Sequence, residues 1–145
     1  MKKKTVDLFE FIHTMGIFDG LTMQKWNRKF KYNLGITPII VLSHLSQYER
    51  LRGVELADKL ELTPGAITNI TNKLYEKKLI SRTTDPNNRR SNYYSLEEEG
   101  LKVLKEAIRV GREMQLDIVE ILTIEEQEQM LNIYKKINKA LSTER

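Results

Sequence analysis

The chain has 145 residues, of which 40% are hydrophobic and 30% charged, so we expect an ordered single domain spanning residues 1–145, or one with an enlarged dimer interface. It contains no cysteine, which excludes disulfides, cysteine-ligated zinc and thiol redox sensing. No signal peptide and no run long enough to span a membrane is found, and the net charge of +4 is too mild to establish nucleic-acid binding; we expect a cytoplasmic protein without a membrane partner.

The N-terminal 33 residues are predicted to be mainly helical, because their apolar residues recur near helical spacing. Gly16 and Gly20 predict a kink or break within this helix. Thr37 and Pro38 then form a typical helix start, a capping side chain followed by a residue of fixed φ. The helix that follows is expected to end near Arg50.

Two short helices and a hairpin are predicted next. The first helix runs from Gly53 to a turn at 61–62, and the second begins at Thr63-Pro64 and ends near residues 77–78. Residues 80–84 and 92–96 have strand-like composition, and the segment 85–91 between them has the asparagines and proline of a turn. Two strands cannot form a core alone, so they must pack on the short helices, as in a winged helix.

The C-terminal third is predicted to form two helices. Apolar residues step by three and four from Leu101 to Leu122, and Thr123 with Glu126 forms a capping box for a last helix. These terminal helices carry more apolar surface than the central unit can cover. We therefore expect a winged-helix unit over residues 36–98 and a helical dimerisation region over 1–33 and 101–145, the alternative being an intrachain helical hairpin.

The second short helix has the chemistry expected of a helix that reads the major groove. Ile67, Ile70 and Leu74 are predicted to form its packed face. Its outward face carries threonines and asparagines, which are poor helix formers but can hydrogen-bond to bases and phosphates. A solvated amphipathic helix is the alternative, although such surfaces usually carry Glu, Lys and Gln instead.

The hairpin adds a basic tip. From Leu62 to Leu96 there are six positive and two negative side chains, a net +4, and Arg89 and Arg90 lie in the predicted loop. Arginine on a thin protrusion suits the narrow minor groove, whereas a solvated charged turn is the simpler alternative. The residues predicted to contact DNA are Thr63, Gly65, Ala66, Thr68, Asn69, Asn72, Lys73, Arg82, Asn88, Arg89 and Arg90.

Five motifs together resemble the MarR family of bacterial regulators (multiple antibiotic resistance regulators). They are Val54-Glu55-Leu56-Ala57, the segment 67–74, Lys78-Leu79-Ile80-Ser81-Arg82, the segment 85–90, and Ser95-Leu96 with Gly100. The match covers about 60 central residues closely, and the flanking helices agree only in layout.

The resemblance implies a dimeric winged-helix protein that usually represses genes and often releases DNA when a small, often aromatic, effector binds. By position, Arg90 matches the wing arginine of the family and Asn69 a frequent base-contacting position. Asn88 stands where the family usually has an aspartate that steadies this arginine, so the wing is looser here or Asp85 substitutes. Glu97 stands where a threonine usually caps the next helix, a role open to Ser95.

Other site types have weaker support. His13 and His44 lie 31 positions apart and give little indication of a metal site, and no cofactor is expected. No arrangement typical of an enzyme is present. A ligand cavity could be lined by four residues, for which ordinary core and interface packing is the favoured alternative: Trp26, Phe30, Tyr32 and His44.

The leading hypothesis is a homodimeric, sequence-specific repressor that binds a pseudo-palindromic operator in double-stranded DNA and responds to a ligand. Two alternatives stay open: a winged-helix module that binds another protein, and a transcription activator without a small-molecule effector. A protein-binding face would be expected to carry an aromatic or arginine anchor where this helix has Thr and Asn.

Overall fold

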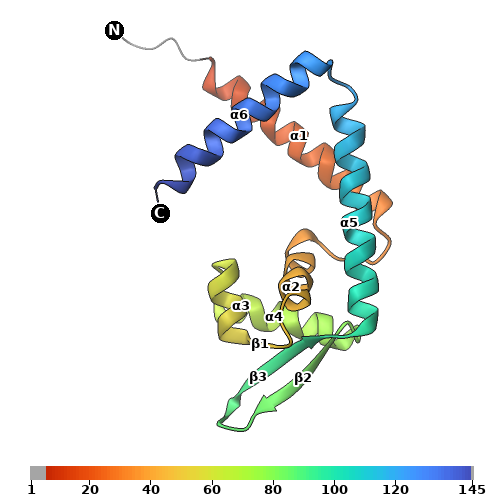
Figure 1. The fold of residues 1–145 in the computed structure, drawn as a ribbon, viewed down its shortest axis with the longest axis vertical. Coiled ribbons are helices and arrows are strands. Elements are labelled where there is room, and N and C mark those ends of the chain that lie inside the picture. The colour runs from red at the N-terminus through yellow and green to blue at the C-terminus, as the bar shows by residue number, and fades with distance from the viewer. Residues whose placement is uncertain (1–5, 145) are drawn as a thin grey trace. The chain divides into compact units, whose positions relative to one another are not determined.

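A computed structural model of the chain describes residues 6–144, in which six helices and a three-stranded sheet are present (Figure 1). The chain divides into two compact units, Met1–Val110 and Gly111–Arg145, and the division falls inside the fifth helix. A mainly helical fold with a small β wing was predicted, and it is confirmed.

The first helix, α1, spans Leu8–Lys29. The Asp7 carboxylate caps it by accepting hydrogen bonds from the backbone N–H of Phe9 at 2.9 Å and of Glu10 at 3.4 Å. The helix continues through Gly16 and Gly20, so no break occurs at either glycine. A glycine costs a helix only about 1 kcal/mol relative to alanine, which the surrounding helix formers offset.

The second helix, α2, spans Ile36–Ser46 and differs from the prediction at both ends. Its N-cap is Gly35, so Thr37 lies inside the first turn. It ends before Arg50 because the chain turns into β1, Leu51–Arg52, a strand too short to leave a periodic pattern in the sequence.

The helix-turn-helix comprises α3, Gly53–Leu60, and α4, Pro64–Glu76. The turn lies at residues 61–62 as predicted; Glu61 adopts a left-handed conformation with φ of 54°, and the Leu62 N–H donates to the Ala57 carbonyl at 3.0 Å. The Thr63 hydroxyl oxygen accepts from the Ala66 N–H at 3.1 Å, which confirms the predicted cap of α4.

The sheet consists of β1, β2 (Ile80–Asp85) and β3 (Asn88–Leu96), all antiparallel in the order β1-β3-β2. Both long strands extend further than expected, so only residues 86–87 form the hairpin turn and the predicted loop 85–91 is wrong. Arg89 and Arg90 therefore lie in β3. The pairing register shifts at this point: Thr84 lies opposite Asn92 and Asp85 opposite Asn88, so residues 89–91 are extra residues on β3.

The core of the first unit joins α2, α3, α4 and the sheet with the first part of α5, Glu98–Val119. Its fully buried side chains include Leu42, Leu45, Leu56, Leu74, Ile80, Val103 and Val110. Of the apolar steps predicted along α5, Leu104 is buried in this core, whereas Leu101 and Ile108 are exposed; Val103, Ala107 and Val110 are buried as well.

Residues 95–101 form the passage from β3 into α5. The Leu101 N–H donates to the Glu97 carbonyl at 3.0 Å, and Ser95 pairs with Ser81 inside the sheet, so Ser95 does not cap the helix. Gly100 allows a close approach, because a Cβ on it would overlap the Leu79 carbonyl oxygen and lie 2.7 Å from Leu96 Cδ1.

The second unit contains the end of α5 and α6, Ile124–Ser142. The predicted capping box is confirmed: the Thr123 hydroxyl oxygen accepts from the Glu126 N–H at 3.2 Å, and the Thr123 N–H donates to the Glu126 carboxylate at 2.9 Å. None of the helices in the described part of the chain is apolar over a stretch long enough to cross a membrane.

Candidate nucleic-acid interface

The two faces of α4 differ as a reading helix requires. Ile67, Thr71 and Leu74 are buried, Ile70 is half-buried, and the predicted contact residues 65, 68, 69, 72 and 73 are exposed. Thr71 was not predicted to be buried; its hydroxyl donates to the Ile67 carbonyl at 2.8 Å, which satisfies it inside the core.

The start of α4 is slim and open. Thr63 and Gly65 are exposed, Ala66 is half-buried, and a Cβ added to Gly65 would meet nothing within 4 Å. Exposed backbone N–H groups at a helix N-terminus attract phosphate. The Thr68 hydroxyl donates to the Pro64 carbonyl at 2.9 Å, so its oxygen remains an acceptor while its methyl group can contact thymine.

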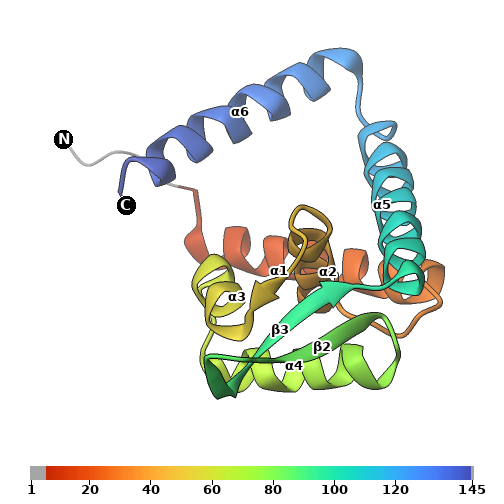
Figure 2. The ribbon, with the colours of Figure 1, turned by 60° about the horizontal axis from the view of Figure 1, so that its bottom comes forward.

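A tight turn sets β2 beside α4 (Figures 1 and 2). Lys78 adopts φ of 61°, its N–H donates to the Tyr75 carbonyl at 2.9 Å, and the Leu79 N–H donates to the Leu74 carbonyl at 3.0 Å. This is a Schellman ending in which a lysine occupies the position glycine usually takes.

Arg82 of β2 reaches across to α4. Its Nη1 donates to Asn72 Oδ1 at 3.2 Å, and its guanidinium carbon lies 4.2 Å from the centre of the Tyr75 ring. Sequence reasoning identified Asn72 and Arg82 separately and missed Tyr75. Its spacing of three residues from Asn72 places the two on one helix face, but nothing in the sequence indicates that a strand would bring an arginine there.

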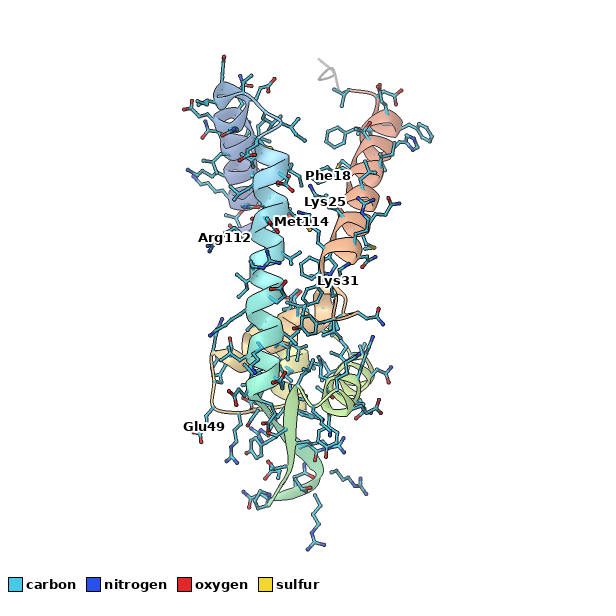
Figure 3. The ribbon with its side chains drawn as sticks, turned by 90° about the vertical axis from the view of Figure 1, so that its right-hand side faces the viewer. Phe18, Lys25, Lys31, Glu49, Arg112 and Met114 are labelled. Atoms are coloured by element: carbon cyan, nitrogen blue, oxygen red, sulfur yellow. The ribbon has the colours of Figure 1, made fainter. Side chains whose placement is uncertain are left out.

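The wing projects beyond α3 and α4 (Figure 1), and its side chains extend outward (Figure 3). The Asn88 Oδ1 accepts from the Arg90 N–H at 3.2 Å, and the buried Asp85 carboxylate accepts from the Asn87 N–H at 2.9 Å. Both side chains thus order the turn through its backbone. Arg89 and Arg90 are exposed on β3, so the wing presents two basic side chains to solvent.

A second basic group, which sequence reasoning missed, lies near β1. The Arg50 guanidinium carbon stacks 3.9 Å from the centre of the Tyr93 ring, and Arg52 Nε lies 3.0 Å from a Glu55 carboxylate oxygen. The hydrogen bond from Arg52 lowers the pKa of Glu55, and the same bond raises the pKa of Arg52.

The predicted ligand residues are only partly brought together. The Trp26 and Phe30 rings lie 4.5 Å apart and the Phe30 and Tyr32 rings 5.5 Å apart, while Trp26 Nε1 donates to the Leu34 carbonyl at 3.2 Å. His44 is half-buried on α2, and within residues 6–144 no ring contact joins it to this aromatic cluster. Among the described residues there is no group of three or more His, Asp or Glu side chains that could hold a metal.

A helix-turn-helix whose second helix exposes hydrogen-bonding side chains beside a basic two-stranded wing defines a winged-helix DNA-binding protein. The sequence model of the MarR family matches residues 36–91. The chain is 31% identical over 112 residues to the HTH-type transcriptional repressor MdtR of Bacillus subtilis (strain 168), an alignment covering 76% of this chain and 72% of that protein. This chain belongs to the MarR family of transcriptional regulators and is not an enzyme.

Two solved structures support the fold. The YusO protein of Bacillus subtilis has a TM-score of 0.73 and 24% identity, with 94% of this chain and 99% of that chain covered. The PcaV transcriptional regulator of Streptomyces coelicolor, in complex with its natural ligand, has a TM-score of 0.73 and 19% identity, with 95% and 99% covered.

Proposed function

We propose that the protein is a homodimeric repressor in the cytoplasm that binds a pseudo-palindromic operator, with α4 in the major groove and the wing in the minor groove. The observation that carries this proposal is that polar and basic side chains are exposed both on the outer face of α4 and at Arg89 and Arg90 of the wing. The relative MdtR is named a repressor, which supports repression here. Two copies would present two reading helices about 34 Å apart, one helical turn of DNA.

The apolar surface of the terminal helices supports the dimer. Neither α1 nor α6 contains a fully buried residue. Phe9 of α1 is 80% exposed, and Phe18 lies along the same helix (Figure 3). Ile133, Ile137 and Leu141 of α6 are also exposed. Apolar surface of this extent on soluble proteins usually marks a protein interface.

The wing role is tested with Arg90→Ala in gel-shift titrations across salt concentrations, using DNA from upstream of the protein's own gene. Loss of one phosphate contact is expected to weaken binding to all duplexes and to lower the salt slope by about 1. Lys102→Ala serves as control, because Lys102 is an exposed cation on α5 outside the proposed surface. Equal affinity of Arg90→Ala and the unaltered protein would reject the wing contact.

We extend the proposal to a small aromatic effector bound near Trp26, Phe30 and Tyr32. The adjacent rings provide stacking surface, and PcaV was solved with its natural ligand. Because Trp26 is the only tryptophan, its fluorescence reports on this cluster alone. Titration with benzoate and larger aromatic acids is expected to change that fluorescence and to release bound DNA at the same concentrations; release without a fluorescence change would place the effector elsewhere.

A further inference from the structure

Asn72 and Asn69 both project from the exposed face of α4, but only one is held by a neighbour. The Asn72 amide oxygen accepts a hydrogen bond from Arg82 at 3.2 Å, whereas the Asn69 side chain makes no hydrogen bond within the described part of the chain. The two asparagines lie almost one helical turn apart and would face neighbouring bases. Their different surroundings predict different base preferences.

The orientation of the Asn72 amide follows from chemistry. A guanidinium has only donors, so the amide atom that faces Arg82 must be the oxygen, since a flipped amide would set donor against donor. The Arg82 side chain is itself steadied, because its guanidinium carbon lies 4.2 Å from the centre of the Tyr75 ring. The Asn72 NH₂ group is therefore the part of the amide that points away from the arginine.

We infer that Arg82 is a positioning residue that fixes Asn72 as a hydrogen-bond donor toward the DNA. An asparagine that turns freely prefers adenine, where it donates to N7 and accepts from N6. With its oxygen already accepting from Arg82, Asn72 instead favours guanine, whose N7 and O6 are both acceptors. This specificity rests on the proposed DNA-binding role of α4, and Asn69 keeps the ordinary preference for adenine.

The test is selection from a pool of duplexes with a randomised central segment, followed by sequencing. The base position read by Asn72 is the one whose preference disappears in Asn72→Ala. In the unaltered protein that position is expected to be guanine. In Arg82→Met, which keeps an apolar stem over Tyr75, guanine enrichment over adenine there is expected to fall on the order of tenfold, within the range of one bidentate base contact.

Two variants distinguish a positioning role of Arg82 from a general effect of its positive charge. Arg89→Met removes the same charge from the wing and is expected to weaken binding uniformly, without changing the preference at the Asn72 position. In the double variant Asn72→Ala with Arg82→Met, the second substitution is expected to change no base preference further. A uniform loss in Arg82→Met, or a preference change that persists without Asn72, overturns the inference.

The contact can also be tested without DNA. In ¹⁵N-labelled free protein, Arg82→Met is expected to shift the side-chain NH₂ signals of Asn72 and to leave those of Asn69 in place. An unmoved Asn72 signal would overturn the inference. Should the unaltered protein enrich no sequence at all, the proposed function fails, and the NMR result still decides the Arg82–Asn72 contact by itself.

Discussion

The winged-helix part buries many of its apolar side chains, whereas the terminal helices leave most of theirs exposed. From α2 to β3, Leu42, Leu56 and Leu74 are completely buried. In α1 and α6 no residue is fully buried, and large apolar side chains such as Phe9 and Ile133 are exposed. The first region supplies its own core, whereas the apolar side chains of the second are left exposed, which supports the dimerisation that we propose for it.

The largest predicted effect is a loss of stability when a core side chain of the winged-helix part is truncated. Leu74→Ala removes a fully buried side chain beneath the reading face of α4, and the cavity left behind should lower the free energy of unfolding by about 2–5 kcal/mol. Denaturant titration measures this loss. Glu76→Ala, on the exposed side of the same helix, is the control and should change stability by less than about 0.5 kcal/mol.

A substitution in the terminal helices should instead weaken the association of two copies in the proposed dimer. Ile137→Lys places a charge in the exposed apolar stripe of α6, and we expect the dimer dissociation constant to rise on the order of tenfold to a hundredfold, which sedimentation equilibrium measures. Asn132→Lys adds the same charge on the other side of α6 and is the control. If both variants remain dimeric to the same degree, α6 is not part of the interface and the contrast between regions breaks down.

The sequence predicted elements with strong local signals and missed those set by tertiary pairing. The caps Thr63 and Thr123 were correct because each bond is made within three residues. The extra residues of β3 were missed because Asn88 pairs with Asp85 and residues 89–91 fall in a register shift between the two strands, which the composition of this segment does not indicate.

The residues of the candidate site also differ in this way: some follow from local signals in the sequence, and others are placed by tertiary contacts. The exposed face of α4 follows from helical periodicity, so its contact residues could be identified in the sequence. The bridge from Arg82 to Asn72 depends on where a turn with a left-handed Lys78 directs β2, and no periodic pattern encodes that.

A third prediction concerns the junction between the two regions, at the start of α5. Gly100→Ala would force the new Cβ against the Leu79 carbonyl and within 2.7 Å of Leu96 Cδ1, so we expect a loss of about 1–3 kcal/mol in the free energy of unfolding. Gly111→Ala on the same helix meets nothing within 4 Å and should stabilise the protein by about 0.4–1 kcal/mol. Thermal or denaturant unfolding of both variants distinguishes close packing from helix propensity, and equal shifts would contradict the close approach at Gly100.

The smallest effect is expected at the surface of the winged-helix part, where Glu55 accepts hydrogen bonds from the side chain and backbone of Arg52 at 3.0 and 3.2 Å. The hydrogen bond lowers the pKa of Glu55 below its ordinary 4.5, so the carboxylate stabilises the fold above that pH and the contribution is lost as pH falls through the lower, folded value. Because the Glu55 side chain is 38% exposed, solvent screening limits the pair to less than about 1 kcal/mol. Glu55→Gln should therefore lower stability slightly at pH 7, and in denaturant titrations the difference from the unaltered protein should shrink as the pH is lowered through the acidic range. A difference that persists unchanged at pH 3 would show that the charge of Glu55 is not what stabilises the start of α3.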